Sequence, residues 1–255
     1  MLTVVTVPFS TAASKWFSEV LKAKTSNASP PLNGFQADSI FVGLVAEENP
    51  ALSHLHNRVK AQDRPLDMLS ISVGGDCLML ADISSKAVRE FLNHPRVVVF
   101  GTDMGKLSKR LETIQDVTIR RGVDLNELAV VSFDRPELDL GRYDFDRLTA
   151  VVLGQEHYVM KPAFIDWSPP AATDEADEVY QFFSVNKVLF TSVVAYLRLQ
   201  IGIKLGHMMD RNVEVPGVKI PALPKTKREG KTREKSPKPG KSDAEEAIKQ
   251  AEAEG

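Results

Sequence analysis

SIFVGLVAE, residues 39–47, is the stretch that decides the fold. Its residues 40–46 form a nearly continuous apolar run of strand length. Such a run is typical of a strand that is buried on both faces, as the central strands of α/β sheets are. We therefore predict a central strand over residues 40–46, with Glu47 at its carboxyl end.

The segments around this strand alternate between strand-like and helix-like patterns. A Gly-Gly pair at 74–75 joins two strand-like runs, 66–73 and 77–83, which predicts a β-hairpin. The remaining patterns predict strands over 2–7 and 97–100 and helices over 11–24, 84–93, 107–114, 124–132, 145–153 and 174–202. We expect one α/β domain over residues 1–213, with a mixed central sheet because it contains a hairpin, and with flanking helices.

Composition separates the last part of the chain from this domain. The 255 residues are 43% hydrophobic and 26% charged, as in ordinary globular proteins. Residues 214–255, in contrast, contain no aromatic residue and are rich in Pro, Lys, Glu and Ser. This composition is typical of chains that cannot bury enough apolar surface to fold, so we predict a disordered tail over 214–255.

Positive charge is concentrated in that tail. Residues 225–241 hold eight Lys and Arg against two Glu, whereas the predicted domain is mildly acidic, which does not favour a nucleic-acid-binding face there. Two interpretations stay open: a nucleic-acid-contacting or nuclear-localisation patch, or a solubilising end. The candidate nucleic-acid-binding residues are Lys225, Lys227, Arg228, Lys231, Arg233 and Lys235.

Other features of the sequence indicate where in the cell the protein is located. Cys77 is the only cysteine, which excludes an intramolecular disulfide and any zinc site that needs two or more cysteines. The N-terminus reads as a strand and not as a signal peptide, and no apolar run reaches the roughly 18 residues of a membrane span. We expect a protein of the nucleus or cytoplasm that has no membrane segment.

Three segments in order, 39–47, 97–111 and 166–184, resemble signature blocks of the DEDD 3′-5′ exonuclease family. Residues 123–129, VDLNELA, are similar to a further family run, and the plant proteins related to the exonuclease domain of the Werner syndrome helicase are the most similar. The resemblance implies an RNase H-like fold. It also implies hydrolysis of phosphodiester bonds by two divalent metal ions, held by an Asp-x-Glu pair, an Asp early in a helix, and an Asp four residues after a Tyr.

Most of those carboxylates are missing. The resemblance places Val45 at the first Asp, Gly105 (or, counting back from Lys109, Lys106) at the second, and Ser184 at the last. Glu47 and Tyr180 remain as the candidate catalytic residues. Because Mg²⁺ requires oxygen ligands, we predict no metal ligand set and no cofactor; Mg²⁺ or Mn²⁺ would be the cofactor of an active enzyme.

The sequence leaves several alternatives open for the roles of individual residues and of the protein. Glu47 is either a weak residual ligand or a solvated strand end, Tyr180 is either catalytic or a core aromatic, and Asp103 could replace a lost ligand. Our leading hypothesis is a degenerate, inactive exonuclease-like protein that binds nucleic acid or a protein partner. The alternative is an active metal-dependent exonuclease on DNA or RNA. A third hypothesis is a structural partner of an active homologue, without affinity for nucleic acid.

Overall fold

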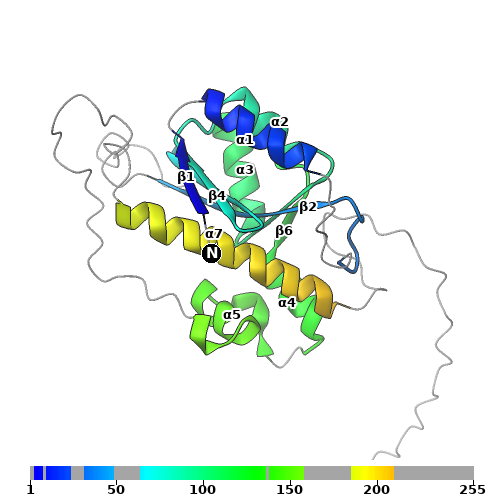
Figure 1. Cartoon of the computed structure of the whole chain (residues 1–255). Helices are drawn as coiled ribbons and strands as arrows, with labels where there is room; N and C mark the ends of the chain where they lie inside the picture. Colours follow the sequence, from blue (N-terminus) through cyan, green and yellow to red (C-terminus); the bar gives the residue numbers. More distant parts are fainter. Residues whose placement is uncertain are drawn as a thin grey trace, which may run out of the picture. The chain divides into compact units, whose positions relative to one another are not determined.

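The computed structural model describes residues 3–7, 10–23, 32–48, 64–135, 138–157 and 185–209. All of them belong to a compact unit that spans residues 1–222, and a second unit, 223–255, lies outside the described residues. The predicted tail, 214–255, and its boundary at residue 213 also lie outside them. Figure 1 shows a central sheet with helices on both of its faces.

Six strands form one mixed sheet in the order β1-β4-β3-β2-β5-β6. Their bounds are Thr3–Val7 (β1), Ile40–Glu47 (β2), Met68–Val73 (β3), Asp76–Leu80 (β4), Val97–Gly101 (β5) and Gly122–Asp124 (β6). Strand β3 is antiparallel to β2 and β4, whereas the other pairs are parallel. Five of these strands, in the order β4-β3-β2-β5-β6, have the RNase H-like arrangement, in which the second strand of this order, β3, is antiparallel to the others. The predicted fold class is therefore confirmed.

The predicted hairpin is confirmed. Val73 pairs with Asp76, which leaves Gly74 and Gly75 as a two-residue turn. Gly74 has φ +59°, a conformation that glycine adopts without the steric cost of a side chain.

Helices cover both faces of the sheet (Figure 1). They are α1 (Ser10–Lys22), α2 (Lys86–Leu92), α3 (Met104–Gln115), α4 (Leu125–Phe133), α5 (Phe145–Val152) and α7 (Val185–Met208), with 3₁₀ turns η4 (Leu140–Arg142) and η5 (Gln155–His157). One apolar core joins β2 and β5 to α1, α2 and α3, and a second joins β5 to α4, α5 and α7.

Several expected boundaries need correction. The second strand of the hairpin ends at Leu80 and not at 83, and the helix expected over 107–114 begins at Met104. Asp124 ends the short strand β6 and caps the next helix, which therefore starts at Leu125 and not at 124. The long helix ends at Met208 and not at 202, because Leu205 continues the face that packs in the second core. The expected start of that helix, residues 174–184, lies outside the described residues.

Helix α7 lies very close to the sheet. Gly43 of β2 faces the helix backbone: a Cβ atom there would collide with the carbonyl oxygen of Ala195 and lie 2.7 Å from the amide nitrogen of Leu199. Gly202 of α7 similarly lies against the Phe100 ring. A Cβ atom added at Gly202 would lie 2.7 Å from Phe100 Cδ1. Two glycines, one on each side, therefore allow the contact.

By length and composition, Leu189–Met208 of α7 could cross a membrane, with a mean hydropathy of 1.2. However, 56% of this segment is buried, and it supplies core residues on the sheet. Its apolar character matches the position of a helix that covers a β-sheet.

We predict that Gly43→Ala lowers the free energy of unfolding by about 1–3 kcal/mol, because the added methyl group must push α7 away from β2. Gly105→Ala is the matched control: Gly105 lies in α3 with nothing within 4 Å of an added Cβ, so this change should raise stability by about 0.5 kcal/mol. Urea denaturation of the three proteins measures both effects. Equal stability of wild type and Gly43→Ala would contradict the close packing.

Candidate functional site

The site expected from the sequence lies at the carboxyl edge of β2 and β5. These strands are parallel, with Gly43 opposite Phe100, so their carboxyl ends meet at one edge. Thr102 and Asp103 then lead from β5 into α3. In α/β sheets such edges are where ligands usually bind.

Strand β2 brings Val45 and Glu47 to one face, because side chains alternate along a strand. Val45 is 3% exposed and packs in a small core with Cys77, Val194 and Ala195, beneath α7. Glu47 is partly exposed at the strand end. An Asp-x-Glu pair would need this same alternation, but Val45 supplies no oxygen atom.

The first turn of α3 also lacks a carboxylate. Gly105 is exposed, and Lys106 at the next position forms an ion pair with Asp103 at 2.8 Å, which raises the pKa of Lys106. Asp103 itself precedes the helix in a left-handed conformation, with φ 52°. The carboxylate of Asp103 is thus exposed, before the helix and bound to a lysine.

Asp124 is an acidic residue at this edge whose carboxylate holds backbone amides of two helices. Its carboxylate accepts hydrogen bonds from the backbone amides of Met104 and Asn126, both at 2.9 Å, and of Glu127 at 3.4 Å. It therefore holds the start of α3 and the start of α4 together, as an N-cap residue. Residues 123–129, VDLNELA, which resemble a run of the exonuclease family, therefore also have a local structural role, since Asp124 caps the helix that they begin.

The remaining predicted site residues lie outside the described residues. They are Tyr180, Ser184 and the tail residues Lys225, Lys227, Arg228, Lys231, Arg233 and Lys235. Their roles stay predictions.

Sequence reasoning missed Arg198, which α7 carries to this edge. Its Nη1 donates a hydrogen bond to the carbonyl oxygen of Leu44 at 2.5 Å, and its Nη2 donates one to Thr102 Oγ1 at 2.8 Å. Its guanidinium also lies 5.5 Å from the centre of the Phe145 ring. The available signal was a single charged residue within the apolar run of this helix.

Burial lowers the pKa of Arg198 to about 10, while the charges of Glu47, Asp124 and Asp103, in decreasing order, act in the opposite direction. The guanidinium is therefore still protonated at neutral pH. A positive charge thus lies at the edge where β2 carries Val45 and Glu47 and where β5 leads into α3.

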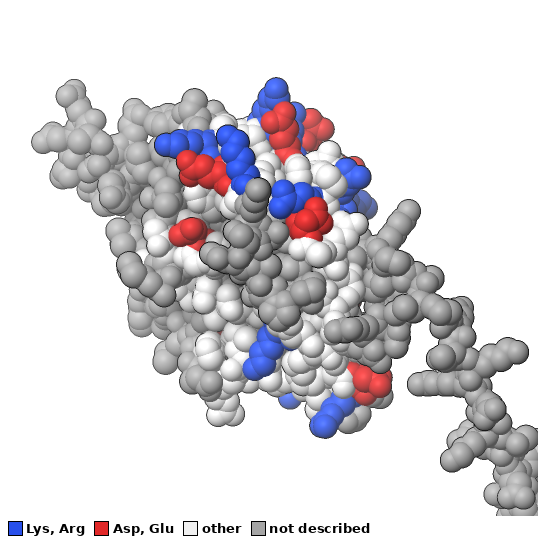
Figure 2. All heavy atoms as spheres, turned by 45° about the vertical axis from the view of Figure 1, so that its right-hand side comes forward, with Lys and Arg blue, Asp and Glu red and all other residues white. Residues whose placement is uncertain are grey.

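A cleft of about 820 Å³ opens in front of this arginine. Its lining includes Arg198 together with Ala46, Glu48, Leu66, Thr102, Asp103, Lys106, Leu107, Lys109, Arg110, Thr113 and Ile114. Four of these side chains are cationic and two are acidic. The cleft thus has an excess of positive charge, although on the face shown in Figure 2 acidic and basic side chains are interspersed.

The site residues that the structure describes do not fit a two-metal centre. Val45 and Gly105 offer no ligand, and Lys106 and Arg198 are cations that would repel a metal ion. Within the described ranges no group of three or more His, Cys, Asp or Glu side chains is arranged to hold a metal.

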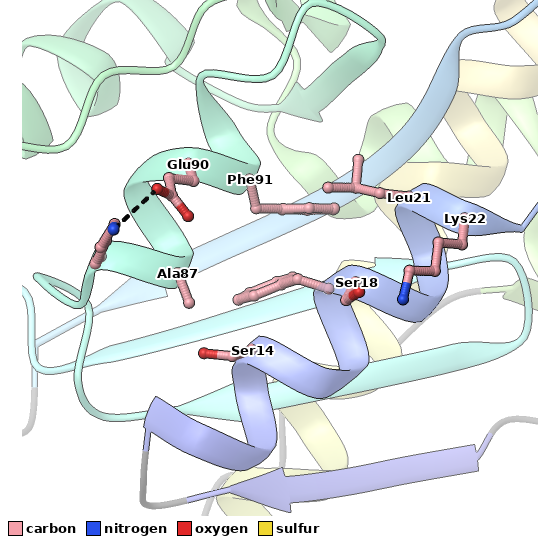
Figure 3. Close-up of a pocket in the computed structure, with 9 residues that line it drawn as sticks. Ser14, Ser18, Leu21, Lys22, Ala87, Glu90 and Phe91 are labelled. Carbon is pink, nitrogen blue, oxygen red and sulfur yellow. Dashed lines mark ion pairs between the residues drawn. The ribbon is translucent and has the colours of Figure 1, made fainter.

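A second hollow, of about 410 Å³, lies between α1 and α2 (Figure 3). Phe17 and Phe91 stack beneath it, with ring centres 4.4 Å apart, and Lys86 and Glu90 form an ion pair of 3.6 Å at its rim. This arrangement is that of a shallow depression over the first core and offers no group of reactive side chains.

Cys77 is fully buried, and burial raises the pKa of its thiol to about 11. We predict no reaction of the native protein with a thiol reagent at pH 8, and complete reaction in denaturant.

The raised pKa also makes stability depend on pH. Because the folded state retains the thiol proton, the stabilisation by the protonated Cys77 is complete below about pH 9 and is lost between pH 9 and 11. Wild type should therefore lose stability relative to Cys77→Ala in that range; rapid native labelling would contradict this.

Comparisons with known proteins are limited to structure. No family model and no curated protein matches the chain. Among solved structures it is similar to RNase D from Escherichia coli, an exoribonuclease involved in structured RNA processing, with 11% identity over 80% of this chain and a TM-score of 0.49. The chain spans 45% of that RNase D chain, less than half of its length.

It is also similar to the EXD2 exonuclease domain, with 16% identity over 80% of this chain and 86% of that domain, and a TM-score of 0.39. The same domain soaked in Mg and GMP gives 15% identity, with 80% and 89% covered and a TM-score of 0.39. At these values the assignment of the RNase H-like fold rests on the strand order of the sheet itself.

Proposed function

We propose that this chain is a degenerate 3′-5′ exonuclease-like protein that no longer hydrolyses phosphodiester bonds and serves as a nucleic-acid-binding module. The observation that carries the proposal is Val45. It is a buried core residue on the strand face where an Asp-x-Glu pair would need its first carboxylate.

The charge distribution supports the same proposal. A metal-dependent nuclease concentrates negative charge where its metal ions bind. Here Arg198 brings a positive charge to the corresponding edge. Lys106 adds a second one directly after Gly105, where the resemblance expects an Asp. An edge with this balance favours an anion over a divalent cation.

The proposal is tested by incubating the purified full-length protein with labelled single-stranded and 3′-recessed substrates, in the presence of Mg²⁺ or Mn²⁺. We expect no release of nucleotides above a blank, because the ligand set is incomplete. A metal-dependent release that disappears in Glu47→Gln would contradict the proposal and establish the alternative, an active exonuclease that uses Glu47. Asp76→Asn, at an exposed position of the hairpin, is the matched control for the charge change.

The basic segment 225–241 is proposed to add sequence-independent affinity for nucleic acid. Each phosphate that is neutralised releases condensed counterions, so such binding falls steeply with salt. Deleting residues 225–255 should therefore weaken binding and flatten its salt dependence, while thermal unfolding stays nearly unchanged because the segment contains no aromatic residue.

A salt titration of binding by the full-length and shortened proteins measures this. Equal affinity and equal slope would remove the tail from the binding surface and leave a role in localisation or solubility. Loss of the folded state on deletion would show that the tail is part of the domain.

A further inference from the structure

We propose that the guanidinium of Arg198 replaces metal ions as the fixed positive charge of the cleft at the β2–β5 edge, and that it binds a phosphate group of nucleic acid without a metal. This inference rests on the proposed function, because it names the group through which the module would hold nucleic acid.

The position of Arg198 is the first step. Its guanidinium bridges the end of β2, through the Leu44 carbonyl, and the segment between β5 and α3, through Thr102. It therefore lies at the junction where the carboxyl ends of two parallel strands meet. Among the acidic side chains, Glu47 has the largest electrostatic effect on Arg198.

The donors of Arg198 are the second step. A guanidinium has five N–H groups, and the two hydrogen bonds to Leu44 and Thr102 use neutral acceptors. Its Nε atom is buried, and no partner for it is present in the described part of the chain. The ion pairs found among those residues do not include Arg198 either. A partly buried charge with no ion pair and with an unpaired, buried N–H is unfavourable, so a bound anion would complete its interactions.

The other charges of the cleft are the third step. Arg110 donates to Glu48 at 2.6 Å, and Lys106 donates to Asp103 at 2.8 Å. The two acidic side chains of the lining are thus already engaged by two of its cations. The charges of Arg198 and Lys109 are not balanced by an ion pair with any carboxylate in the described ranges.

Shape and chemistry point to a phosphate ester. The cleft, about 820 Å³, is within the usual size of small-ligand sites and can hold a nucleotide. The planar guanidinium forms paired hydrogen bonds with phosphate oxygens, and it needs no metal to do so. Lys109 of α3 also lines the cleft and adds a second cation to it.

The test measures binding of a short labelled single-stranded oligonucleotide to the full-length protein in EDTA, over a range of salt concentrations. The variants are Arg198→Met, Arg198→Lys and Lys109→Met. Arg147→Met is the control, since Arg147 is exposed and stacks on Tyr143 at 4.3 Å without lining the cleft. Circular dichroism and thermal unfolding report whether each variant folds.

We expect EDTA to leave wild-type affinity unchanged. Arg198→Met should lose roughly tenfold or more in affinity, and its salt slope should fall by about one. Arg198→Lys should retain the slope but recover only part of the affinity, because a point charge lacks the planar fork. Lys109→Met should lower the slope, and Arg147→Met should match wild type.

Wild-type binding that needs a metal, or equal affinity and slope in wild type and the cleft variants, would overturn this inference while leaving nucleic-acid binding by the chain intact. If Arg198→Met does not fold, Arg198→Lys and Lys109→Met decide. If wild type binds no oligonucleotide, the proposed function is wrong, and thermal shift with pyrophosphate then tests the cleft alone. A shift in wild type that is smaller in Arg198→Lys and Lys109→Met would assign the cleft a small phosphate compound, and no shift would overturn the inference.

Discussion

Helix α7 can lie on β2 only because position 43 has no side chain. The backbone of β2 there faces the Ala195 carbonyl and the Leu199 amide directly, with Gly202 making a similar contact against Phe100. This close approach fixes where every later residue of α7 lies relative to the sheet. It buries Val45 beneath Val194 and Ala195, and it brings Arg198 within hydrogen-bond distance of Leu44 and Thr102. The packing constraint and the candidate site are therefore one feature of the molecule.

The same edge of an RNase H-like sheet supports two opposite electrostatic arrangements. Converging carboxylates attract divalent cations, which in turn hold the phosphate. A partly buried arginine supplies positive charge directly, and a strand residue at the same edge can then be apolar. On the proposed function, Val45 lies where an Asp-x-Glu pair would need its first carboxylate, and Arg198 supplies a cation. The α7–β2 contact brings both residues to the same edge of the sheet.

Most of the fold could be predicted from local patterns. The apolar run at 40–46 indicated the central strand, and the Gly74-Gly75 pair indicated the hairpin, because both signals depend only on neighbouring residues. Strand β6 was missed because three residues are too few to show a period. Arg198 was missed because its partners lie 154 and 96 residues away in sequence, so its role exists only after folding. Gly43, within a strand, was a signal of close backbone approach that could have been used.

We propose that a fixed arginine charge takes the place of a metal site at this edge. Titration of Mn²⁺ into the full-length protein, followed by electron paramagnetic resonance of the free ion, tests it most directly. We expect no saturable loss of the free Mn²⁺ signal, because Val45 and Gly105 supply no ligand and Arg198 repels the ion. Saturable binding of two ions per chain, abolished by Glu47→Gln, would contradict it.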